Sequence, residues 1–136
     1  MDLYRLYLVT DDKQDLVTLK NVVREAVAGG VTMVQVREKQ RDIRCFIEIA
    51  LAVKAVLKGS GIPLIINDRV DVALAIDADG VHLGQSDMPA GIARRLLGKD
   101  KLLGLSIENE QQLIEAESLP IDYLGLSAIF ATPTKT

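Results

Sequence analysis

The stretch PLIINDRVDVALAIDADGVHL, residues 63–83, holds two short apolar runs separated by a helical pattern. Residues 63–67 predict a strand with Pro at its first position, which a strand tolerates. Residues 70–77 predict a short helix, and residues 80–83 predict the next strand. A strand, a helix and a second strand in so short a stretch predict a βαβ unit, which joins parallel strands.

The same alternation extends from this unit toward both ends of the sequence. Further strands are predicted at residues 6–10, 32–37, 102–106 and 123–130, and further helices at 16–28, 43–58, 88–97 and 109–118. Gly29-Gly30 is a typical helix end, and Asn109 is a plausible N-cap. The runs LIIN and YLGLSAIF are near-continuously apolar, which is typical of parallel strands buried on both faces.

Two architectures built from βα units compete, the closed (β/α)₈ barrel and the open doubly wound sheet. The open sheet usually carries a Gly-rich phosphate-binding turn after its first strand, but residues 10–14 (TDDKQ) contain no glycine. Polar and ionisable residues instead follow several different strands, which is typical of the barrel. We therefore expect an α/β fold of the (β/α)₈ TIM-barrel class.

The length of the sequence limits how much of such a barrel it can form. Five units between Tyr4 and Asp122 take roughly 24 residues each, so eight would need roughly 190. The sequence has 136 residues. We expect residues 1–136 to form a single, C-terminally incomplete barrel domain with strands one to six and their helices. Whether the last two units follow on the same polypeptide or come from another chain is open.

Composition excludes several classes of protein. The net charge of -3, the 4% of aromatic residues and the absence of Trp disfavour a nucleic-acid-binding protein. The single cysteine, Cys45, cannot form an internal disulfide, and with no activating base nearby we expect it to be buried and structural. No apolar run approaches the ~18 residues of a membrane span, and the acidic N-terminus is unlike a secretory signal. We expect a cytoplasmic domain that binds neither nucleic acid nor membrane.

Residues 32–39 (TMVQVREK) alternate strictly, so Gln35, Arg37 and Lys39 share one face at the carboxyl end of their strand. In a barrel this face looks inward and toward the rim where sites are built. The alternative is a solvated strand end that leads into a loop. Gln35 favours the site, because a polar group inside a strand needs a partner.

Asp68 and Asp87 follow two neighbouring predicted strands. Each could simply cap the helix after it. Both could instead reach one Mg²⁺, which prefers one or two carboxylates together with substrate phosphates and water. Both interpretations stay open.

Two further features of the sequence could bear on function. His82 is the only histidine, so a zinc site is poorly supported and a hydrogen-bonded histidine in the core or at the rim is favoured. Residues 131–136 (ATPTKT) place hydroxyls and a lysine after the last strand, where they could bind phosphate oxygens or form a tail.

Taken together, these segments resemble the thiamine-phosphate synthase (thiamine-phosphate pyrophosphorylase) family of (β/α)₈ barrels. The matching stretches are LYLVTD (6–11), GGVTMVQVREK (29–39), residues 63–89 from PLIIND to GQSDMP, LLGLS (102–106) and DYLGLSAIFATPTKT (122–136). The set NDR, GQSDMP and TPTKT favours the synthases over the thiazole tautomerases, which share the barrel.

The resemblance implies a transferase of thiamine biosynthesis. It would join 4-amino-2-methyl-5-hydroxymethylpyrimidine diphosphate to 4-methyl-5-(2-hydroxyethyl)thiazole phosphate, giving thiamine phosphate and pyrophosphate by a Mg²⁺-dependent, dissociative mechanism. The implied partners are therefore small molecules, and the barrel can self-associate. Two alternatives remain, a related thiazole tautomerase and a non-catalytic ligand-binding fragment. Whether residues 1–136 alone catalyse the reaction is open.

The resemblance also implies site residues. The metal ligands would be Asp68 and Asp87, and the catalytic residues Arg37, Lys39 and Lys135. The substrate-binding residues would be Gln35, Val36, Arg37, Glu38, Lys39, Asn67, Ser106, Thr132, Thr134 and Lys135, with Thr132 and Thr134 reaching the thiazole phosphate.

Overall fold

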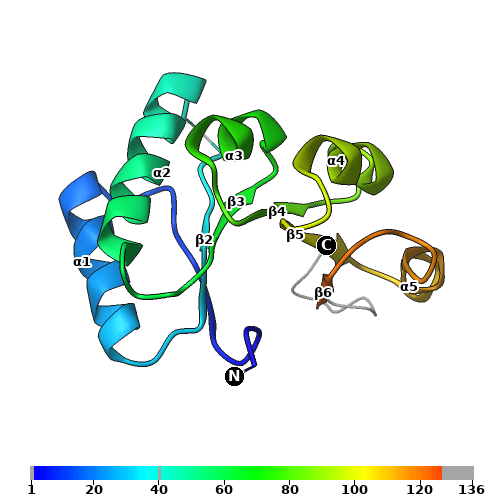
Figure 1. Ribbon diagram of the computed structural model, residues 1–136, viewed down its shortest axis with the longest axis horizontal. Helices are drawn as coiled ribbons and strands as arrows, with labels where there is room; N and C mark the ends of the chain where they lie inside the picture. The colour runs from blue at the N-terminus through cyan, green and yellow to red at the C-terminus, as the bar shows by residue number, and fades with distance from the viewer. Residues whose placement is uncertain (1, 40, 127–136) are drawn as a thin grey trace, which may run out of the picture.

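The computed structural model describes residues 2–39 and 41–126 as one parallel six-stranded sheet with five helices (Figure 1). The strands are β1 (Tyr7–Val9), β2 (Met33–Val36), β3 (Leu64–Asn67), β4 (Gly80–Leu83), β5 (Leu102–Ile107) and β6 (Tyr123–Leu126). The helices are α1 (Leu16–Ala28), α2 (Ile43–Leu57), α3 (Val70–Ile76), α4 (Ala90–Leu97) and α5 (Glu110–Ala116).

Each strand pairs in parallel with the next strand of the sequence, so the order in the sheet is β1 to β6 without a reversal. An open doubly wound sheet would reverse its strand order at a switch point. The helices lie around the outside of the curled sheet (Figure 1). The predicted fold class is therefore confirmed for strands one to six of a (β/α) barrel.

The predicted boundaries of the helices and strands agree with the structure to within a few residues. Helix caps explain two boundaries that agree, and a proline explains one that differs. Gly29 ends α1 and Asn109 caps α5 by accepting the Gln112 N–H, both as predicted. Helix α4 begins at Ala90 rather than at residue 88. Pro89 is the cause, because a residue that precedes proline is disfavoured in the helical region. Residues 127–130 of the last predicted strand lie outside the described residues.

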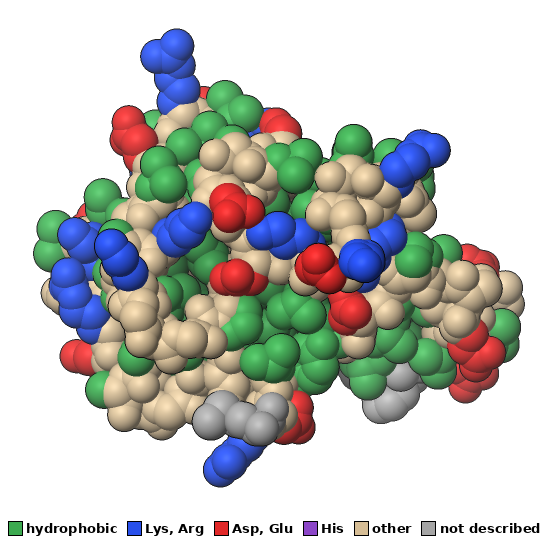
Figure 2. All heavy atoms as spheres, in the orientation of Figure 1, with side chains coloured by type: hydrophobic (Ala, Val, Ile, Leu, Met, Phe, Trp, Pro, Cys, Tyr) green, Lys and Arg blue, Asp and Glu red, His purple; other side chains and the backbone are tan. Residues whose placement is uncertain are grey.

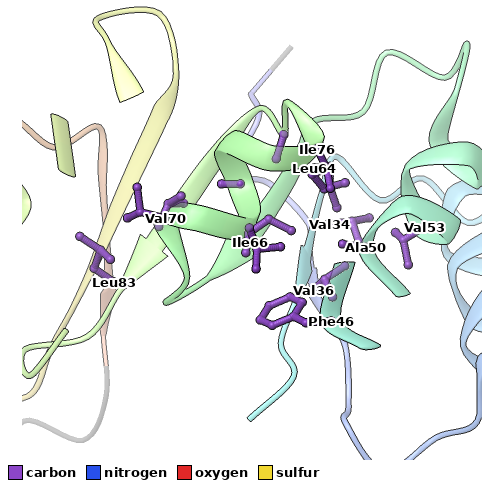
Figure 3. Close-up of a cluster of buried hydrophobic side chains, with 14 of the residues drawn as sticks. Val34, Val36, Phe46, Ala50, Val53, Leu64, Ile66, Val70, Ile76 and Leu83 are labelled. Carbon is purple, nitrogen blue, oxygen red and sulfur yellow. The ribbon is translucent and has the colours of Figure 1, made fainter. Parts of the chain in front are cut away.

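One face of the sheet packs against the helices and forms the hydrophobic core. Figure 3 shows Phe46, Ala50 and Val53 of α2 close to Val34 and Val36 of β2. The outward-pointing residues of the central strands belong to the same core: Val34, Val36, Leu64, Ile66, Val81, Leu83, Leu103 and Leu105. Burial of these side chains supplies most of the driving force for this arrangement.

The other face of the sheet is concave and carries polar side chains. Gly104 lies on this face of β5, and a Cβ atom there would clash with the ring of Tyr123. The missing side chain therefore lets the Tyr123 ring lie across β5 and reach the interior. This close approach shapes the site described next.

The outer surface of the helices carries charged side chains of both signs, as Figure 2 shows for one side of the molecule. Among the described residues, no helix is both long enough and apolar enough to cross a membrane.

Candidate active site

A cavity of about 550 Å³ lies on the concave face of the sheet. Every strand contributes to its wall, through Tyr7, Val9, Gln35, Asn67, His82, Ser106, Tyr123, Leu124 and Gly125, together with Arg37 just after β2. Four residues singled out from the sequence, Gln35, Arg37, Asn67 and Ser106, thus meet at one cavity. Such convergence of side chains from different strands is how barrels build their sites.

Hydrogen bonds link the polar side chains of the first three strands to β6. Asn67 Nδ2 donates to Gln35 Oε1 at 2.6 Å, and Gln35 Nε2 donates to the Tyr7 hydroxyl at 2.9 Å. The hydroxyls of Tyr7 and Tyr123 are 2.5 Å apart. Gln35 is only 3% exposed, and these bonds satisfy both ends of its amide. The solvated alternative for this strand end is therefore wrong at Gln35.

The same series of bonds continues through the histidine. Nδ1 of His82 lies 3.0 Å from the Tyr123 hydroxyl, and Nε2 lies 2.6 Å from Ser106 Oγ. Burial lowers the pKa of His82, which favours a neutral ring at neutral pH. The prediction of a hydrogen-bonded histidine is confirmed. We call Asn67, Gln35, Tyr7, Tyr123, His82 and Ser106 the interior network.

Asp68 and Asp87 lie side by side at the carboxyl ends of β3 and β4, and their carboxyl groups share a hydrogen bond. Burial, and then the bond to Asp87, raise the pKa of Asp68, while the same bond lowers the pKa of Asp87. Lys39 Nζ lies 3.4 Å from Asp68 Oδ2, and the Gly84 N–H donates to Asp87 Oδ2 at 2.6 Å. Lys39 thus joins the pair, as the alternation in β2 predicts.

Neither aspartate caps a helix, so the capping interpretation is wrong for both. The N-cap positions of α3 and α4 are Arg69 and Pro89, and neither helix has a side-chain cap. Asp68 adopts a left-handed conformation (φ 73°), and its amide donates to the His82 carbonyl. A non-glycine residue in this region carries strain that tends to persist where a functional constraint holds it.

The carboxylate pair suits a hard divalent cation that takes most of its ligands from elsewhere. The pKa of Asp68 is raised by burial and by the neighbouring Asp87, and a bound cation would stabilise both negative charges. Within the described residues no group of three or more His, Cys, Asp or Glu side chains could hold a metal. Two carboxylates completed by phosphate oxygens and water are what Mg²⁺ prefers.

The structure separates other predicted site residues from the cavity. Val36 faces the helices within the hydrophobic core, because it alternates with Gln35 along β2. Glu38 is also buried outside the cavity, with Oε2 3.5 Å from Arg41 Nε, and burial raises its pKa. Neither side chain therefore lines the predicted substrate site. Thr132, Thr134 and Lys135 lie outside the described residues.

Cys45 differs from its prediction in exposure. It is half-buried rather than buried, and hydrogen bonding to Asp42 raises the pKa of its thiol. A raised pKa keeps the thiol protonated and unreactive, which agrees with the structural role expected for it.

The sequence reasoning missed Tyr7, Tyr123 and Gly104. The signals were present: a buried tyrosine hydroxyl needs a hydrogen-bond partner, and a glycine inside a strand often marks a close approach. Neither signal identifies the partner, because Tyr7 and Tyr123 belong to β1 and β6, at opposite ends of the strand order.

The strand order and the cavity place this protein among the (β/α)-barrel proteins. The family model described as thiamine monophosphate synthase matches residues 6–136. The chain belongs to this family, which confirms the resemblance drawn from the sequence.

Curated relatives and a solved structure agree with this assignment. The chain is 78% identical over its whole length to the thiamine-phosphate synthases of Vibrio campbellii and Vibrio parahaemolyticus, and covers 67% of each. It is 53% identical over 97% of its length to the thiamine-phosphate synthase of Syntrophomonas wolfei, and covers 64% of that protein. The thiamine phosphate pyrophosphorylase of Pyrococcus furiosus superposes with a TM-score of 0.82 at 36% identity, over 98% of this chain and 64% of that one. The chain thus spans about two thirds of the length of the relatives it matches.

Proposed function

We propose that this protein is a Mg²⁺-dependent thiamine-phosphate synthase. It joins 4-amino-2-methyl-5-hydroxymethylpyrimidine diphosphate to 4-methyl-5-(2-hydroxyethyl)thiazole phosphate and releases pyrophosphate. Family membership supports this reaction. The observation that carries the proposal is the carboxylate pair of Asp68 and Asp87, which lies beside Lys39 and directly follows the cavity-lining Asn67.

Asp68 and Asp87 are the residues that would hold Mg²⁺, as their chemistry fits. The ion would neutralise the charge of the diphosphate and of the pyrophosphate as it leaves. Arg37, which lines the cavity, and Lys39, 3.4 Å from Asp68, add positive charge at the same edge. Their role is electrostatic stabilisation of the departing anion, an effect that is usually large in catalysis.

The part of the cavity lined by β2, β3 and β5 suits a neutral aromatic ring that carries hydrogen-bonding groups. Its lining includes the neutral polar side chains of Gln35, Asn67 and Ser106 and the rings of Tyr7, Tyr123 and His82. Asn67 Oδ1 is buried and has no partner among the described residues. A buried acceptor of this kind favours a ligand that brings a donor, such as the amino group of the pyrimidine.

The chemistry then requires positioning rather than a protein nucleophile. The bond between the pyrimidine methylene carbon and the diphosphate oxygen breaks, and its electron pair leaves with pyrophosphate. The lone pair of the thiazole nitrogen forms the new C–N bond to that carbon. The protein holds both substrates in line, which lowers the barrier by removing the entropy cost of their meeting. Thr132 and Thr134 remain the predicted contacts for the thiazole phosphate, and Lys135 remains a predicted contact for the pyrimidine diphosphate.

The test is an assay of the protein as the cell makes it, with both substrates and Mg²⁺. We expect thiamine phosphate and pyrophosphate in equal amounts, and no product when Mg²⁺ is chelated or either substrate is omitted. Exchange of a thiazole carboxylate phosphate between tautomers, without pyrimidine and without thiamine phosphate formation, would identify a tautomerase instead. Binding of the pyrimidine diphosphate by calorimetry with no turnover would identify a non-catalytic binding protein.

A further inference from the structure

The interior network joins two parts of the cavity that the sequence keeps far apart. Asn67 and Gln35 lie on β3 and β2, whereas Ser106 lies on β5. The Tyr123 hydroxyl lies between them, 2.5 Å from the Tyr7 hydroxyl and 3.0 Å from His82 Nδ1. Among the described residues, the hydrogen bonds connect the two parts through this one hydroxyl.

The network has a direction. Asn67 donates to Gln35 and Gln35 donates to Tyr7, so the Tyr7 oxygen is already an acceptor. If Tyr7 then donates its single proton to Tyr123, the Tyr123 hydroxyl can donate to His82 and the ring N–H of His82 can donate to Ser106. If Tyr123 donated to Tyr7 instead, the proton of the largely buried Tyr7 hydroxyl would have no acceptor among the described residues.

The direction of the hydrogen bonds determines which ring nitrogen of His82 carries the proton. Tyr123 donates its proton to His82 Nδ1, so Nε2 of the neutral ring carries the proton and donates to Ser106 Oγ at 2.6 Å. The Ser106 hydroxyl keeps its own proton for a ligand. The network therefore presents an acceptor at one end, Asn67 Oδ1, and a donor at the other, Ser106.

The packing around Tyr123 leaves its ring little choice of position. A Cβ at Gly104 would clash with the ring, and a Cβ at Gly125 would lie 3.0 Å from His82 Cε1. The rings of Tyr4, Tyr7 and His82 have centroids 5.1, 5.7 and 5.5 Å from that of Tyr123. Contacts on several sides hold the ring, and a hydroxyl held in this way can orient its partners.

We propose that Tyr123 and His82 are positioning residues that set the donor and acceptor order of the site. They act on the ligand through Ser106 on one side and through Gln35 and Asn67 on the other. The ring that binds must therefore bring a donor to Asn67 and an acceptor to Ser106. This inference rests on the proposed function for the identity of the ring, the pyrimidine of the diphosphate substrate.

The first test is steady-state kinetics of Tyr123→Phe in the protein as the cell makes it. We expect the KM for the pyrimidine diphosphate to rise about tenfold, since two hydrogen bonds are lost from an otherwise unchanged ring. The KM for the thiazole phosphate should stay within a factor of about two. Gly104→Ala should reproduce this split, because it displaces the same ring without removing a polar group.

Two comparisons separate positioning from general damage. Tyr4 also lines the cavity and packs against Tyr123, but its hydroxyl is not part of the interior network, so Tyr4→Phe should change the pyrimidine KM less than Tyr123→Phe does. His82→Gln keeps one donor and one acceptor and should retain more activity than His82→Leu. In a double-mutant cycle, the effects of Tyr123→Phe and Ser106→Ala should be less than additive.

Additive effects, or equal changes in both KM values, would overturn the inference while wild-type turnover still supports the proposed function. A wild-type protein that makes no thiamine phosphate would overturn the proposed function instead. The order of the network is tested without turnover by the ¹⁵N spectrum of His82, assigned with His82→Gln. A ring protonated at Nε2 supports the order, and one protonated at Nδ1 overturns it.

Discussion

The two faces of the sheet differ although they alternate along the same strands. On β2, Val34 and Val36 point to the helices, and Gln35 between them points into the cavity. On β4, Val81 and Leu83 join the core, whereas His82 joins the interior network. The outer face is apolar and closely packed, and the inner face is polar and bonded across six strands. Stability is therefore concentrated on one face and binding on the other, so substitutions should separate the two properties.

The largest effect is expected from Asp87→Asn on the inner side. Product formation should fall by about a hundredfold or more, because a neutral amide is a poor ligand for a hard cation. The free energy of unfolding should change little. Activity assays and thermal unfolding of the same preparation measure both quantities.

The matched control is Asp77→Asn, which removes a surface carboxylate paired with Lys101 at 2.7 Å and leaves the cavity untouched. Full activity of Asp87→Asn would refute the metal role of the pair. Equal loss in both variants would point to a general charge effect.

The converse experiment changes the outer face. Leu64→Ala should lower the free energy of unfolding by about 2–5 kcal/mol, because it leaves a cavity in the core beneath α2 and α3. Any folded fraction should bind substrates with unchanged KM. Denaturant unfolding measures the loss, and Leu74→Ala on the exposed side of α3 should stay within about 0.5 kcal/mol. Comparable losses at the two leucines would contradict the packing described for the outer face.

A smaller effect is expected in the helix layer that covers the outer face. Asn109→Ala removes the side chain that accepts the Gln112 N–H, and should lower the free energy of unfolding by about 1 kcal/mol. Gln111→Ala, at an exposed position in the first turn of the same helix, is the control. No difference between the two variants would show that the cap contributes nothing measurable.

The smallest effect is expected at Asp68 on the inner face, where the ionised carboxyl lowers the stability of the folded protein. The pKa of Asp68 is raised in the folded protein, so the folded state holds this proton more tightly than the unfolded state does. The contribution of Asp68 to stability is therefore favourable at low pH and is lost as pH rises through the raised pKa. In chelator at pH 7, Asp68→Asn should unfold at a slightly higher temperature than the wild type.

Two conditions check the origin of that gain. The difference should disappear below about pH 3, where the Asp68 carboxyl is protonated in most molecules of both states. Added Mg²⁺ should stabilise the wild type but not the variant. A variant less stable than the wild type at pH 7 would show that Asp68 serves the fold rather than a ligand.

Much of the fold follows from local pattern. Alternating apolar strands and amphipathic helices predict all six strands and five helices, and the absence of glycine after β1 argues against an open sheet. The candidate site could be predicted from the sequence only in part. Period-two alternation placed Gln35, Arg37 and Lys39 on one face, but it also shows why Val36 and Glu38 cannot share that face. The open choice at Asp68 and Asp87, cap or cation ligand, needed the backbone angles of the loops after β3 and β4.

The order of elements, the two sides of β2 and the family were determined by the sequence itself, because they depend on short-range periodicity and ordered motifs. Only the tertiary structure decided which side chains meet. Tyr7 and Tyr123 are 116 positions apart in sequence, and their hydroxyls come within 2.5 Å because the sheet curls and Gly104 leaves space for a ring. Sheet curvature and the fit of one side chain against another are long-range properties, so no local pattern contains them.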